Sequence, residues 1–100
     1  MKITFDLSIL SEQEKEEYAG YIIGIHAVGR LTGKANFMTK VADFQMPGII
    51  QVLTDLGHDA EELVLELYEF QKESLPKYMV TAENIVEEVK KLFNELGKSK

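Results

Sequence analysis

The stretch from Tyr18 to Leu31, YAGYIIGIHAVGRL, limits the choice of fold more than any other part of this chain. At about 100° per residue, its apolar side chains fall on every side of a helix, so no face is clearly polar. A helix that is apolar all round has to be buried all round. We therefore predict a central core helix here, around which the remaining elements pack.

Small residues mark a strip along one side of this predicted helix. The strip consists of Gly20, Gly24, Ala27 and Leu31. Because the two glycines carry no side chains, another backbone can approach closely. In a bilayer this spacing would indicate a dimerising transmembrane helix, but the stretch is shorter than the roughly 20 apolar residues of a span and contains His26 and Arg30. Two interpretations stay open: internal packing, or self-association with a second copy of the chain.

Apolar and polar residues alternate from Lys2 to Ile9, which is the period-two pattern of a strand with one face on the core. A lone strand needs a partner, because an unpaired edge favours association. The weaker segments Phe37–Phe44 and Lys77–Val80 are candidates for pairing within the chain. The same strand of another subunit is the other candidate, and that pairing would again make the protein a homo-oligomer.

Capping residues and apolar stripes predict four helices. Ser11 stands three residues before Glu14, a capping box that opens the first helix at Glu12, and this helix ends near Gly33. Each of its internal glycines costs about 1 kcal/mol relative to alanine, so a buried strand over residues 21–28 remains the alternative.

The other three helices have their own start and stop signals. The second spans Pro47–Leu56, because proline is favoured at the first position of a helix. Asp59 caps a third helix that ends before Pro76. Thr81 caps a last helix that closes at Gly97.

These elements predict an α+β fold dominated by helices, with about four helices, an N-terminal strand and a minimal sheet of about two or three strands. Residues 1–97 form one globular domain and residues 98–100 a frayed tail. A content of 45% hydrophobic and 28% charged residues is that of an ordinary soluble domain. The N-terminus lacks the continuous apolar run of a secretory signal, so we expect a cytoplasmic location.

Charge and residue types exclude several kinds of function. The chain has no cysteine, which rules out disulfides, thiolate metal sites and a cysteine nucleophile. Its formal net charge of −6 opposes binding to anionic membranes and to nucleic acid. Leu53–Leu67 has the outline of a helix-turn-helix, but its second helix is acidic, so we expect no direct DNA binding.

Gly29–Ala35 makes a poor phosphate loop, since it is one residue short between its glycines.

No catalytic constellation, cofactor fingerprint or metal site stands out. His58 lies beside Asp59, Glu61 and Glu62, yet their spacing matches no zinc or calcium loop. No Ser-His-Asp order or nucleotide motif is present. We therefore predict a protein that is not an enzyme and that has no cofactor and no metal.

Four glutamates follow one face of the predicted third helix, three or four residues apart. They are Glu62, Glu66, Glu69 and Glu73. Such a row is either an ordinary solvated face or a docking surface for a basic protein partner.

Three hypotheses for function follow. The first is a small cytoplasmic interaction protein without enzymatic activity, which binds other proteins and forms a homo-oligomer through the first helix and the N-terminal strand. The second is an acidic inhibitor or nucleic-acid-mimicking decoy, of the phage or mobile-element type, that binds a basic partner through the four glutamates. The third is a small-molecule sensor with a pocket at Tyr18, Tyr21 and His26.

Overall fold

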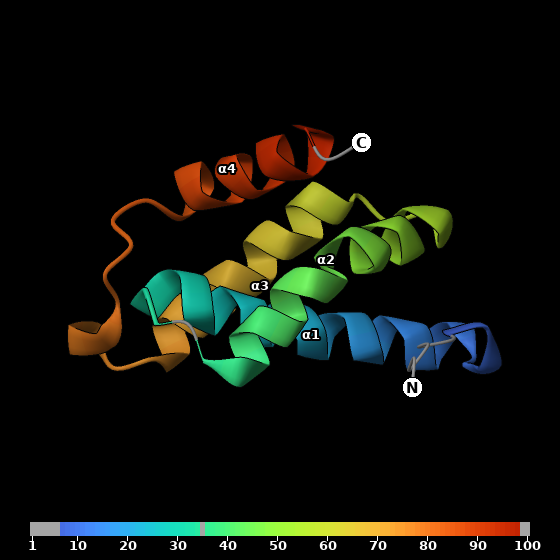
Figure 1. Cartoon of the computed structure of the whole chain (residues 1–100), viewed down its shortest axis with the longest axis horizontal. Coiled ribbons are helices and arrows are strands. Elements are labelled where there is room, and N and C mark those ends of the chain that lie inside the picture. Colours follow the sequence, from blue (N-terminus) through green and yellow to red (C-terminus); the bar gives the residue numbers. More distant parts are fainter. Residues whose placement is uncertain (1–6, 35, 99–100) are drawn as a thin grey trace.

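The computed structural model of the chain describes residues 7–34 and 36–98, which fold into four α-helices and two short 3-10 helices. The α-helices are α1 (Glu12–Thr32), α2 (Phe37–Asp55), α3 (Ala60–Ser74) and α4 (Ile85–Lys98). The 3-10 helices are η1 (Leu7–Ile9) and η2 (Lys77–Met79). In Figure 1, α3 crosses above α1, α4 lies above α3, and a long connection joins these last two helices at one end of the molecule.

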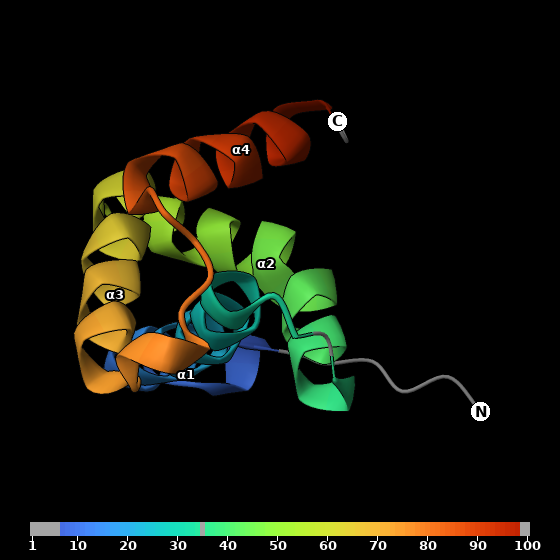
Figure 2. The same cartoon turned by 90° about the vertical axis from the view of Figure 1, so that its left-hand side faces the viewer.

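The prediction of a central core helix is confirmed, but the expected burial all round is wrong, because Tyr21 is 65% exposed and Ile25 and Val28 are only half-buried. Figure 2 shows α1 nearly along its axis, with α2 on one side, α3 on the other and α4 across the top. Residues 21–28, for which the sequence leaves a buried strand open, are helical. The buried residues of α1 are Ala19, Ile22, Ile23, Gly24, His26, Ala27, Leu31 and Thr32.

Two helix starts are capped as the sequence predicts. The Ser11 hydroxyl accepts from the Glu14 N–H at 3.1 Å, and the Glu14 carboxylate accepts from the Ser11 N–H at 2.9 Å. The Asp59 carboxylate accepts from the Glu62 N–H at 3.2 Å and caps α3. Each bond satisfies an N–H group that the first turn of a helix leaves free.

The connection between α3 and α4 closes over the C-terminal end of α1. That helix ends at Gly33, which takes the left-handed conformation with φ of 68°. The carbonyl of Leu31, in the last turn, accepts from the N–H groups of Thr81 and Ala82 at 2.8 and 3.2 Å. The carbonyl of a helix end is thereby satisfied, and the chain leading into α4 is tied to α1.

The predicted strand over Phe37–Phe44 is wrong, because these residues form the first part of α2. Asn36 and Thr39 make a reciprocal capping box that starts this helix. The predicted helix start at Pro47 is also wrong, since Pro47 lies inside α2. A proline there removes one backbone hydrogen bond, but a buried apolar stripe continues on both sides of it and holds the helix against the core. The stripe is Ala42, Met46, Ile49 and Leu53.

The other expected strand segments form no sheet either. Lys77–Val80 contains η2, and the last residues of the Lys2–Ile9 segment form η1, while residues 2–6 lie outside the described part of the chain. The predicted α+β class is therefore wrong, because the described residues are helical and contain no strand. For α2 the physical reason is that its buried residues recur every three or four positions, which is the period of a helix and not of a strand.

The last helix begins later than the sequence predicts. Asn84, and not Thr81, supplies its cap, since the Asn84 side-chain oxygen accepts from the Glu87 N–H at 3.2 Å. The Thr81 hydroxyl instead donates to the end of α1. At its other end α4 continues past the predicted stop at Gly97 and includes Lys98, which the sequence places in a tail.

The close approach of α1 and α2 yields a matched pair of substitutions. At Gly29 a Cβ atom would lie 2.5 Å from Thr39 Cγ2, and the Thr39 hydroxyl is held because it accepts from the Asn36 N–H and donates to the Asn36 carbonyl. We expect Gly29→Ala to lower the free energy of unfolding by about 1–3 kcal/mol, because overpacking outweighs the gain in helix propensity. At Gly20 nothing lies within 4 Å, so Gly20→Ala should raise it by up to about 1 kcal/mol. Urea unfolding measures both, and equal stability of the two variants would contradict a tight crossing.

Candidate functional site

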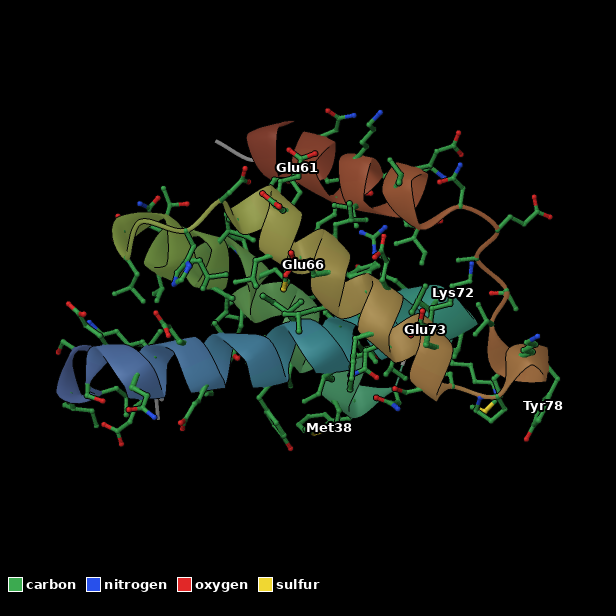
Figure 3. The ribbon with its side chains drawn as sticks, turned by 180° about the vertical axis from the view of Figure 1, so that it is seen from behind. Met38, Glu61, Glu66, Lys72, Glu73 and Tyr78 are labelled. Atoms are coloured by element: carbon green, nitrogen blue, oxygen red, sulfur yellow. The ribbon has the colours of Figure 1, made fainter. Side chains whose placement is uncertain are left out.

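The outer face of α3 carries the glutamates singled out by their spacing, which we call the acidic stripe (Glu62, Glu66, Glu69 and Glu73). All four side chains are exposed, and Figure 3 shows Glu66 and Glu73 following one another along the helix. Within the described residues none of the four forms a salt bridge, whereas Arg30 is paired with two other glutamates, Glu88 and Glu95. The acidic stripe therefore leaves its negative charge uncompensated.

A groove of about 770 Å³ lies beside the second half of the stripe, between α3 and the chain that leads into α4. We call it the α3–α4 groove. Its half-buried apolar side chains are Leu75, Val80, Ala82 and Ile85. Its exposed charged side chains are Glu69, Lys72, Glu73, Lys77 and Glu83. Lys72 and Glu73 appear at this end of α3 in Figure 3, so the groove combines an apolar floor with a charged rim.

A smaller hollow of about 230 Å³ lies at the other end of the stripe. Its lining residues are Asp59, Glu61, Glu62, Leu65, Val86 and Val89. Glu62 of the stripe lines this hollow, and Glu69 and Glu73 line the α3–α4 groove. The stripe and the two hollows therefore form one continuous surface, which we call the α3 face.

The inner side of α3 is held by a hydrogen-bond chain that joins three helices. The hydroxyl of Tyr68 in α3 lies 2.8 Å from Nδ1 of His26 in α1, and Nε2 of His26 lies 3.0 Å from Oδ1 of Asp43 in α2. Tyr68 and His26 are buried, whereas 60% of the Asp43 side chain is exposed. Since the three residues belong to three different helices, their hydrogen bonds set how these helices lie relative to one another.

Burial keeps His26 neutral. It lowers the pKa of His26 from the ordinary 6.5 to about 4, although the neighbouring Asp43 carboxylate acts in the opposite direction. A neutral imidazole has one N–H group, so Nε2 donates to Asp43 and Nδ1 accepts from the Tyr68 hydroxyl. Burial also raises the pKa of Tyr68, which keeps its hydroxyl protonated. The Tyr68 hydroxyl and both ring nitrogens of His26 thereby have partners, as buried polar groups require in a packed core.

A third hollow, of about 240 Å³, lies where Asp43 approaches the end of α1. It includes the glycines of the segment considered as a phosphate loop. Gly29 lies within α1 and Gly33 caps that helix, so the backbone N–H groups between them are used by the helix and do not surround a phosphate. Arg30 also lines the hollow, but its guanidinium binds Glu95 at 2.7 Å, which neutralises its charge.

The structure does not bring together the residues predicted for a small-molecule site. His26 is buried, Tyr21 is 65% exposed, and the Tyr18 hydroxyl donates to Gln45 Oε1 at 2.7 Å. Neither tyrosine lines the hollow beside His26. A shared ligand site for these three residues therefore has no support in their positions.

The small-residue strip predicted for self-association faces the interior of the same chain. Gly24, Ala27 and Leu31 are buried, and Gly20 is half-buried. A Cβ atom at Gly24 would lie 3.2 Å from the Gln71 side chain of α3. The close approach at Gly24 is thus made by the Gln71 side chain of α3, whereas nothing lies within 4 Å of a Cβ atom at Gly20. Formation of a homo-oligomer stays a prediction, and it would need other surfaces.

Sequence reasoning missed the partners of His26 and the α3–α4 groove. An isolated histidine in an apolar stretch signals that a buried partner is needed, but Tyr68 and Asp43 lie on other helices, where no local pattern marks them. The sequence does not indicate the groove, because the residues of Lys77–Val80 are also compatible with a strand fragment. The exposed acidic stripe, in contrast, follows from spacing alone.

Comparisons of the chain with known protein families, with curated proteins and with solved structures gave no match. None of the described helices is long and apolar enough to cross a membrane. Among the described residues, no three histidine, aspartate or glutamate side chains are grouped so that they could hold a metal ion. A functional proposal for this chain therefore rests on its surfaces.

The low pKa of His26 gives stability a defined pH dependence. The unfolded chain takes up this proton near pH 6.5 and the folded chain near pH 4, so stability that is present above pH 6.5 is lost as the pH falls toward 4. Over this interval we expect the free energy of unfolding to fall by roughly 2–3 kcal/mol more in the wild type than in His26→Gln. Denaturant unfolding at several pH values measures the difference.

The control for this prediction is the other histidine. His58 lies on the surface, 2.8 Å from Glu16, so His58→Gln removes a histidine without changing the buried contacts of His26. Wild type and His26→Gln losing stability in parallel would contradict the assignment of a neutral His26.

Proposed function

We propose that this chain is a protein-binding domain without enzymatic activity, whose α3 face docks a basic segment of another protein. The observation that carries the proposal is that the acidic stripe borders a groove with an apolar floor. Protein interfaces combine an apolar centre, which supplies most of the affinity, with a polar rim. The α3 face offers both parts side by side.

The uncompensated charge of the stripe supports a basic partner. Like charges one helical turn apart repel each other by a few tenths of a kcal/mol per pair. A bound lysine or arginine relieves this repulsion. Because no salt bridge within the described residues already does so, the gain in free energy contributes to binding. The net charge of −6 also attracts a cationic segment and speeds its association.

The packing of α3 leaves this face open to a partner. Val64 and Tyr68 are fully buried on the inner side of the helix, and Val89 and Leu92 of α4 are buried next to it. The side chains of the acidic stripe point away from these contacts. A partner can therefore contact the stripe without displacing any part of the described core.

The other hypotheses use the surface differently. A decoy of nucleic acid would use the stripe alone, because phosphates are matched by charge and not by an apolar floor. A small-molecule sensor would use the hollow beside His26, where the two predicted tyrosines are absent from the lining. Self-association through the small-residue strip would require exposure of Gly24, Ala27 and Leu31, which are buried. A basic protein segment accounts for both the stripe and the groove.

Binding of a labelled oligolysine peptide tests the charge part of this proposal. We expect Glu69→Gln with Glu73→Gln to weaken binding by about two- to thirtyfold, since each of the two exposed ion pairs contributes roughly 0.2–1 kcal/mol. Binding should also weaken as salt is raised. Fluorescence anisotropy at two salt concentrations measures both effects.

The matched control removes the same charge elsewhere. Glu12→Gln with Glu17→Gln neutralises two exposed carboxylates at the start of α1 and leaves the α3 face unchanged. If both double variants lose affinity equally, the peptide responds only to net charge and the α3 face is not a docking surface. If the Glu69→Gln and Glu73→Gln double variant binds as tightly as the wild type, the α3 face is likewise not a docking surface.

A further inference from the structure

We infer that the α3–α4 groove holds an amphipathic helix of the partner, with apolar side chains in the groove and lysine or arginine residues beside the acidic stripe. This inference rests on the proposed function and specifies the form of the partner segment. Three features of the groove support this inference. They are the apolar floor, the backbone N–H groups of one wall, which already donate hydrogen bonds within the chain, and the distribution of charge on the rim.

The floor offers a rigid apolar surface. Leu75, Ala82 and Ile85 pack against the hydrophobic core, so the side chains that would meet the partner are held from below. The groove volume of about 770 Å³ gives room for several apolar side chains of a partner. Helices that bind in grooves insert apolar side chains spaced three or four residues apart, and a floor of this kind receives them.

The backbone of the groove favours a helix over an extended peptide. Along the connection, the N–H groups of Met79 and Val80 donate within the η2 turn, and those of Thr81 and Ala82 donate to the Leu31 carbonyl. An extended peptide binds by adding its hydrogen bonds to the edge of a sheet, and the described part of the chain contains no strand. A helix satisfies its own backbone groups and needs only side-chain contacts.

Charge on the rim favours basic residues on both sides of the apolar stripe of the partner. Glu69 and Glu73 stand on the α3 wall, and Glu83 stands on the wall formed by the connection. Lys72 and Lys77 interrupt the rim, so acidic side chains dominate by three to two. The rest of the acidic stripe extends this negative surface along α3. An apolar stripe flanked by lysine or arginine is thus complementary to the groove.

The test measures binding of a labelled synthetic helix with leucines on one face and lysines on the others to the full chain. Three control peptides separate the contributions: serine in place of every leucine, glutamate in place of every lysine, and the same composition in scrambled order. Two groove variants without a change of charge accompany them, Val80→Ser, which makes the floor polar, and Ala82→Phe, which fills it. Circular dichroism verifies that each variant is folded.

The expected result is that the leucine–lysine helix binds roughly tenfold more tightly than the serine and scrambled peptides, and that Val80→Ser or Ala82→Phe weakens it about three- to tenfold. If the serine or scrambled peptide binds the wild type as tightly, the groove inference is overturned while the charge-based proposal stands. If the glutamate peptide binds as tightly as the lysine peptide, the proposed function fails and the inference fails with it.

Discussion

Burial of one broad side of α1 is the constraint on which the rest of the structure depends. The apolar residues on that side have to leave water, so α2 and α3 pack on two sides of α1 and the connection before α4 closes over its end, while Tyr21 on the remaining side stays exposed. The Leu31 carbonyl at this end binds the backbone of Thr81 and Ala82. The same connection forms one wall of the α3–α4 groove, so the candidate docking surface is a consequence of how the core helix is capped.

The burial of α1 also decides which way α3 faces. His26 lies inside the core and needs partners for both ring nitrogens, because an unpaired polar group there is costly. Tyr68 supplies one of them and must therefore point inward. Successive helical residues are rotated by about 100°, so this orientation turns the acidic stripe outward. The orientation of α3 about its own axis thus produces both the hydrogen bond in the core and the charged surface.

The features that can be predicted from the sequence are those determined by neighbouring residues in the chain. The capping box at Ser11, the cap at Asp59 and the central position of α1 are confirmed, and so is the exposure of the four glutamates. The predicted sheet is wrong because Phe37–Phe44, which has only a weak strand pattern, belongs to a helix whose buried stripe continues beyond Pro47. The partner of His26, 42 residues away in Tyr68, and the groove both arise from tertiary packing, which no local spacing encodes.

The most direct test of the central claim is a residue-by-residue map of where the leucine–lysine helix binds, obtained from amide chemical-shift changes of the isotope-labelled chain. The account predicts that the largest changes lie between Glu69 and Ile85, around the α3–α4 groove, and that they shrink as salt is added. Changes centred instead on the outer side of α2, where Phe37 and Phe44 are 77% and 88% exposed, or spread evenly over the chain, would contradict it.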